Sequence, residues 1–127
     1  MSAIKVEVQD LHFEHKLWTN ELEFFAGELK FFEKRLGELV SRYREIEVLA
    51  ELEHFQNQFI RQKEVLDKLL RDIHVHEQLL SNKLQREADI TDALLDEHAD
   101  LREQMSDYRR IYNEIKEDFF RYLAKWT

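Results

Sequence analysis

Almost nothing in this chain of 127 residues can interrupt a helix, because it has no proline and only two glycines, Gly27 and Gly37. Sheets and barrels need a turn after about every 8–12 residues, usually at Gly, Pro, Asn or Asp. Long stretches of this sequence carry almost none of these residues. The sequence therefore predicts an all-α protein, and its length predicts a single domain spanning residues 1–127.

Apolar side chains recur every three or four residues in three successive runs, which is the spacing of one face of a helix. Further apolar residues flank the first run, so its buried face is wider than the seam of a two-stranded coiled coil. This pattern predicts a long antiparallel up-down-up three-helix bundle. The runs extend from Leu11 to Tyr43, from Leu52 to Leu80 and from Glu87 to Trp126, and the polar exceptions within their apolar parts are His15, Gln62, His76 and His98.

The ends of the runs predict helices at about 10–42, 48–84 and 90–126. No residue between 41 and 48 forces a turn, but the first run loses its phase there, and one continuous helix from Asp10 to about Leu84 stays open as an alternative. Ser81 and Asn82 mark the second turn. Asp10 and Asp89 are the predicted N-caps of the first and third helices.

Residues 1–9 show a different pattern, since Ile4, Val6 and Val8 alternate with polar residues at the period of a strand. They predict an extended N-terminal arm. A single strand cannot stand alone, so this arm is either a frayed tail or a strand that pairs with a second copy.

Several classes of function conflict with the composition. The chain has no cysteine for a disulfide, a thiolate zinc site or a nucleophile. Its net charge of −8 disfavours nucleic acid as a partner. No apolar run approaches the ~18 residues of a membrane span, and no signal peptide is apparent. With neither a glycine-rich phosphate loop nor a nucleophile elbow, we expect a cytoplasmic, non-enzymatic protein that binds no membrane.

Three histidines are expected to meet near one end of the bundle. In antiparallel neighbours His15 lies level with residue 75, and His76 lies level with His98; His12 lies one turn before His15. Imidazole binds zinc, iron, copper and nickel, and bundle cores often hold metals. The sequence therefore predicts a candidate site for a divalent metal such as zinc or iron at His12, His15, His76 and His98. The alternative is a set of polar residues at a solvated bundle end.

Known metal bundles do not share these spacings. The Glu-x-x-His pattern of ferritin-like proteins occurs once, at Glu51 and His54, far from the predicted cluster. No histidine is followed four residues later by the Glu or His that hemerythrin-like proteins need. The sequence therefore points to no known family of metal bundles.

Gln62 is the polar exception in mid-bundle. It is expected level with Tyr112, whose hydroxyl would satisfy the buried amide, and Gly27 would leave room for the pair. Alternatively, Gly27 marks only a surface position.

Fifteen aromatic residues are many for the narrow core of a three-helix bundle. They include three adjacent pairs, and neighbouring helix positions point about 100° apart, so one member of each pair should lie at the edge of the buried face. Our leading interpretation is a structural or interaction protein that self-associates or docks a partner protein through an aromatic helix edge. The alternative is a metal-binding bundle, or a metalloenzyme, that uses the histidine cluster. The pairs are Phe24-Phe25, Phe31-Phe32 and Phe119-Phe120.

Overall fold

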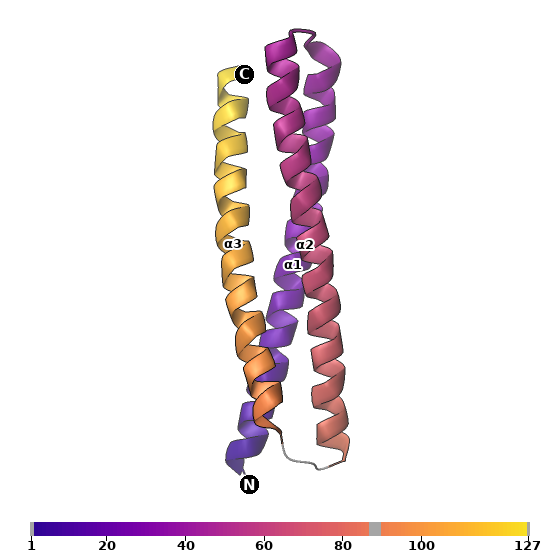
Figure 1. Cartoon of the computed structure of the whole chain (residues 1–127), viewed down its shortest axis with the longest axis vertical. Helices are drawn as coiled ribbons and strands as arrows, with labels where there is room; N and C mark the ends of the chain where they lie inside the picture. The colour runs from indigo at the N-terminus through magenta and orange to yellow at the C-terminus, as the bar shows by residue number, and fades with distance from the viewer. Residues whose placement is uncertain (1, 87–89, 127) are drawn as a thin grey trace.

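The computed structural model describes residues 2–86 and 90–126. It contains three long helices, α1 (Ser2–Arg42), α2 (Ile46–Gln85) and α3 (Asp92–Trp126). They form a rod in which α1 and α3 run in the same direction and α2 runs in the opposite one (Figure 1). The start of α1, the end of α2 and the start of α3 lie at the same end of this rod. The predicted up-down-up three-helix bundle is confirmed, and the described residues contain no strand.

The prediction of an extended arm at residues 1–9 is wrong, because α1 begins at Ser2 and runs through Asp10 without a break. Val8 is only 3% exposed and lies three residues before Leu11, so it adds a further position to the first apolar run. The short alternation of apolar residues also contains the four-residue spacing of a helix. A strand has no partner here, whereas the helix buries Val8 against the bundle.

The two connections lie close to the predicted turns. Residues 43–45 join α1 to α2, within the predicted span of 41–48. α3 begins at Asp92, two residues after the predicted start at 90, and Asp89, the predicted N-cap, lies outside the described residues. Thr91 caps α3 instead, since its Oγ1 accepts a hydrogen bond from the backbone N–H of Leu94 at 3.2 Å.

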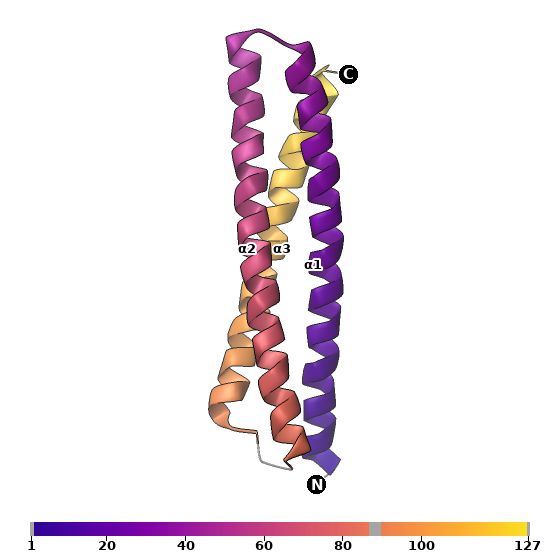
Figure 2. The same ribbon diagram turned by 90° about the vertical axis from the view of Figure 1, so that its right-hand side faces the viewer.

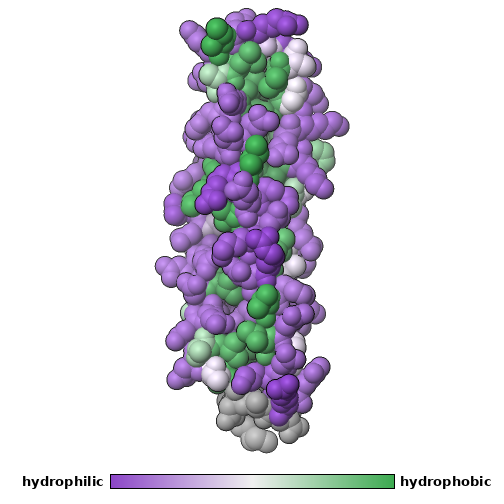
Figure 3. Space-filling view, turned by 45° about the vertical axis from the view of Figure 1, so that its right-hand side comes forward, coloured by the Kyte–Doolittle hydropathy of each residue, from purple (hydrophilic) through white to green (hydrophobic). Residues whose placement is uncertain are grey.

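The core contains buried side chains from all three helices, and the helices wind around one another along the rod (Figure 2). The expected division of the adjacent aromatic pairs is confirmed. Phe25, Phe32 and Phe119 are buried, whereas their neighbours are 61%, 73% and 47% exposed. Apolar patches interrupt a mostly hydrophilic surface in one view of the molecule (Figure 3). None of the helices in the described part of the chain has the length and apolar content needed to cross a membrane.

The predicted contact between Gln62 and Tyr112 is wrong. Tyr112 instead donates its hydroxyl hydrogen to Oε1 of Glu28, a residue of α1, at 2.6 Å. Tyr108 donates instead to the backbone oxygen of Gln62 at 3.2 Å. The side-chain oxygen of Gln62 is buried and has no hydrogen-bond partner among the described residues.

Three ion pairs join the parallel helices α1 and α3, and we call them the ion ladder. Successive pairs are seven residues apart on both helices, which is the arrangement of flanking charges in parallel coiled coils. The spacing of apolar residues did not predict this ladder, since it says nothing about charged partners on different helices. The pairs are Glu14–Arg102 at 2.6 Å, Glu21–Arg109 at 2.6 Å and Glu28–Lys116 at 2.9 Å.

Gly27 and Gly37 are exposed positions within α1, and a Cβ atom at either would meet no other atom within 4 Å. We expect Gly27→Ala to raise the free energy of unfolding by about 1 kcal/mol, because alanine loses less backbone entropy in a helix. Gly37→Ala should do the same, and the double variant should be nearly additive. Urea denaturation measures these changes. A loss of stability at Gly27 would contradict its assignment as a plain surface position.

Candidate metal centre

One buried histidine from each helix lies in a single layer near the end of the bundle that holds the N-terminus. The structure thus brings together His15, His76 and His98, which are 2%, 3% and 1% exposed. Their ring centroids are between 4.9 and 5.6 Å apart. The fourth predicted residue, His12, lies outside this histidine layer. Its ring contacts Glu77, and its side chain is 45% exposed.

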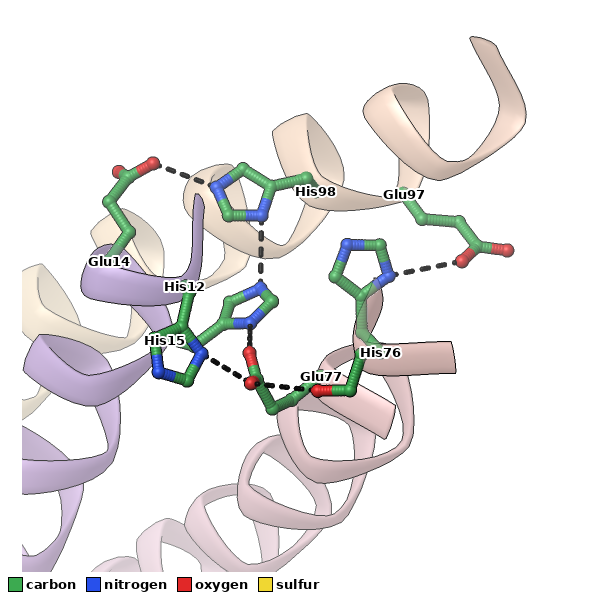
Figure 4. A network of polar contacts seen from close by, with 8 residues as sticks. His12, Glu14, His15, His76, Glu77, Glu97 and His98 are labelled. Carbon is green, nitrogen blue, oxygen red and sulfur yellow. Dashed lines mark hydrogen bonds and ion pairs between the residues drawn. The ribbon is translucent and has the colours of Figure 1, made fainter. Parts of the chain in front are cut away.

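One nitrogen of each ring faces the other two rings, and these three atoms lie within 4.8 Å of one another. His15 Nε2 and His98 Nδ1 are 3.0 Å apart. His76 turns toward them the nitrogen that is not bonded to Glu97 (Figure 4). This nitrogen, Nε2, is buried and has no hydrogen-bond partner among the described residues.

The opposite nitrogen of each ring faces a carboxylate from a different helix (Figure 4). Each helix therefore supplies one histidine and one glutamate to the layer. In metal sites such carboxylates orient the imidazole and fix which nitrogen carries the hydrogen. The three contacts are His15 Nδ1 to Glu77 Oε1 at 2.7 Å, His98 Nε2 to Glu14 Oε1 at 2.7 Å, and His76 Nδ1 to Glu97 Oε2 at 3.3 Å.

Sequence analysis did not identify these glutamates, although each is the direct neighbour in sequence of a layer histidine. The pairs are Glu14-His15 in α1, His76-Glu77 in α2 and Glu97-His98 in α3. The order is reversed in α2, which is the helix that runs in the opposite direction. This repeated pairing is the sequence signal that could have revealed the complete arrangement.

Protonation of the layer follows from its surroundings. Hydrogen bonds from Arg102 lower the pKa of Glu14 to about 2, so this carboxylate is ionised at neutral pH. Burial lowers the pKa of both His15 and His98, despite the opposing effect of their carboxylate partners. Both imidazoles are then neutral, and each has a single hydrogen to donate.

The hydrogens belong on the outer nitrogens of His15 and His98, because carboxylate oxygens accept hydrogen bonds. The inner nitrogens, His15 Nε2 and His98 Nδ1, then carry lone pairs that face each other across 3.0 Å. The unpartnered nitrogen of His76 lies within 4.8 Å of both. Three ring nitrogens directed at one point form an arrangement that a cation would stabilise.

The surroundings of the layer differ from one side to the next. Glu77 is shared, since it contacts His12 as well as His15 and accepts a hydrogen bond from Ser81 Oγ at 3.5 Å. The indole of Trp18 stacks on His98 with a centroid distance of 4.9 Å. The layer therefore has polar contacts at the outer nitrogens of its rings and an aromatic contact between Trp18 and His98.

Without metal, the stability of the protein should fall as the pH decreases below about 6.5. The unfolded chain takes up protons at that pH, whereas the lowered pKa values of His15 and His98 keep the folded imidazoles neutral. The contribution of His15 and His98 to the free energy of unfolding is therefore fully present above this pH. It is lost as the pH falls toward the pKa values that these histidines have in the folded protein. Each group contributes a slope of at most about 1.4 kcal/mol per pH unit.

The measurement is urea denaturation between pH 8 and pH 5 in the presence of a chelator. His15→Leu should weaken the dependence of the free energy of unfolding on pH. His54→Leu, which changes a residue at the far end of the bundle, should leave this pH dependence unchanged. Equal slopes in the wild type and in His15→Leu would contradict the assignment of a neutral His15.

Comparison with known proteins gives no relative from which a role could be transferred. No protein-family model, curated protein or solved structure matches the chain. The following proposals therefore rest on the geometry and charge of the histidine layer and of the helix surfaces.

Proposed function

We propose that this protein is a metal-binding helical bundle that holds one divalent transition-metal ion, such as zinc or iron, between His15, His76 and His98. One observation carries the proposal. The three rings direct one nitrogen each at a common point, while their outer nitrogens contact carboxylates. Neutral imidazoles with carboxylate partners are common metal ligands.

The distances suit such an ion. Zinc–nitrogen bonds of about 2.0–2.1 Å place the ligand nitrogens of a tetrahedral site roughly 3.3 Å apart. The inner nitrogens of His15 and His98 are 3.0 Å apart, and all three lie within 4.8 Å of one another. Small rotations of the rings, of His76 above all, would bring the three nitrogens into bonding positions.

The charge around the layer favours a doubly charged ion. Its histidines contact three carboxylates, and among their partners Arg102 supplies one guanidinium, which donates two hydrogen bonds to Glu14. Three carboxylates therefore surround the histidines beside a single guanidinium. A divalent cation would offset this excess of acidic groups.

Metal content and calorimetry test the proposal. The protein, dialysed against zinc or iron(II) and then against metal-free buffer, should retain one ion per chain. His76→Leu should lose this ion and keep its helix content, because leucine suits the apolar layers on either side. The matched control is His74→Leu, which changes an exposed histidine two residues away. Absence of binding by the wild type, or unchanged affinity in His76→Leu, would refute the proposed site.

A second candidate function is self-association through the outer face of α1. Phe13, Leu17, Phe24 and Phe31 are between 50% and 73% exposed, and the last three recur every seven residues. We call them the outer aromatic stripe. Burying a phenylalanine side chain contributes roughly 1.5–3 kcal/mol, so covering several of them would favour an oligomer.

Light scattering and sedimentation test this second candidate. We expect a dimer or larger assembly at high micromolar concentration, and Phe24→Glu should shift it toward the monomer. Lys30→Glu, on another exposed part of α1, is the control for added negative charge. A wild-type monomer throughout this range would exclude self-association. The outer aromatic stripe would then be left as a surface for binding a different protein.

A further inference from the structure

The histidine layer supplies three ligands but no fourth. The neighbouring carboxylates Glu14, Glu77 and Glu97 contact the outer nitrogens of the rings, away from the point where the inner nitrogens meet. Structural zinc sites usually have four protein ligands, whereas sites with three keep a position for an exogenous ligand. Of the positions three or four residues away on each helix, those that are buried are all apolar: Leu11, Trp18, Ile73, Leu80, Leu94 and Leu101.

Three surface grooves, one between each pair of helices, lie beside the layer. The groove between α1 and α3 is closed at Glu14, which accepts hydrogen bonds of 2.9 and 2.6 Å from Arg102. The groove between α1 and α2 is lined by His15 and by Glu77, which contacts both His12 and His15. In both grooves the carboxylate beside the layer is held by at least two side chains.

The groove between α2 and α3 is less obstructed. It has a volume of about 290 Å³ and is lined by His76, Leu79 and Glu97, among others. The contact between His76 and Glu97, at 3.3 Å, is the longest of the three histidine–carboxylate contacts. The Glu97 side chain is also 58% exposed. A sideways movement of this one carboxylate would open a path along His76.

We infer that the metal centre has an open coordination position, reached through the α2–α3 groove, that takes water or a small anion with a single donor atom. This inference rests on the proposed metal site. Asp72, Glu97 and Asp100 line the groove, so it favours water or a singly charged anion over anions of higher charge. A metal ion with an open position acts as a Lewis acid toward the ligand that it receives.

The test uses protein loaded with cobalt(II), whose visible absorption depends on its ligands, and azide as the exogenous ligand in high salt. Azide should change the spectrum in a saturable manner. Leu79→Trp, which fills the α2–α3 groove, should slow azide binding severalfold in stopped-flow measurements. Asn20→Trp, which fills the α1–α2 groove, is the matched control and should leave the rate unchanged.

The outcomes separate the two proposals. If cobalt binds and azide leaves its spectrum unchanged, the centre is closed, and only the open position is refuted. If azide binds but Asn20→Trp slows it as much as Leu79→Trp does, the route through the α2–α3 groove is wrong. If the wild type binds no cobalt, zinc or iron, the metal site and the open position both fail.

Discussion

Zinc added at pH 7 is expected to raise the melting temperature of the protein by roughly 10–20 °C when its free concentration is about a thousand times the dissociation constant. A ligand at that excess that binds only the folded state stabilises it by about 4 kcal/mol, and the shift follows from the entropy of unfolding of a chain of this size. The increase should fade toward pH 5, because protons compete with the metal for each imidazole. Differential scanning calorimetry provides the measurement.

His98→Ala should abolish this response and keep the helix content, because it removes one of the three ligands. His54→Ala is the control, since His54 lies in a groove at the other end of the bundle. If zinc, iron, copper and nickel all leave the melting temperature of the wild type unchanged, the histidine layer is a set of polar residues at a bundle end. The proposed function would then be reduced to protein interaction alone.

Phe32→Ala should lower the free energy of unfolding by about 3–5 kcal/mol, the usual effect of removing a large aromatic ring from a core. The Phe32 side chain is 8% exposed, and its ring centroid lies within 5.7 Å of those of Phe59, Phe119 and Phe120. Phe31→Ala, one position away, should change the free energy by no more than about 0.5 kcal/mol, because Phe31 is 73% exposed.

Urea denaturation compares the free energies of unfolding of the two variants. Their m-values should equal that of the wild type. It should be made at a protein concentration low enough to exclude self-association, since Phe31 belongs to the outer aromatic stripe. Similar losses for the two variants would contradict the division of this pair into a core residue and a surface residue.

The fold could be predicted from the sequence because each apolar run keeps the helix period for more than 25 residues. At that length many apolar positions define the same buried face of the helix. One polar residue among them, such as Gln62, does not change which face is buried. The start of α1 could not be predicted in this way, because a few residues at the chain end satisfy both the strand and the helix spacing. The structure distinguishes the two, because α1 begins at Ser2 and buries Val8.

The meeting of His15, His76 and His98 could also be predicted, because two short turns fix which residues of antiparallel helices lie level. The adjacency of Glu14, Glu77 and Glu97 to these histidines places them near the layer, but which ring each carboxylate contacts depends on how far its side chain reaches around the edge of its helix. The ion ladder could not be predicted from the sequence either. Its partners lie on α1 and α3, which are not joined directly, so their relative height depends on both turns together.

The connectivity of these contacts also sets an order of events during folding. Residues 43–45 close the α1–α2 hairpin locally, whereas the partners in the ion ladder are 88 residues apart, and His15 and His98 are 83 residues apart. Contacts between distant residues form more slowly, because a larger loop must be closed. In refolding, amide protection should therefore develop around the two turns before α1 and α3 meet. The histidine layer is completed only when α1 and α3 have met, so its assembly marks the last stage of folding.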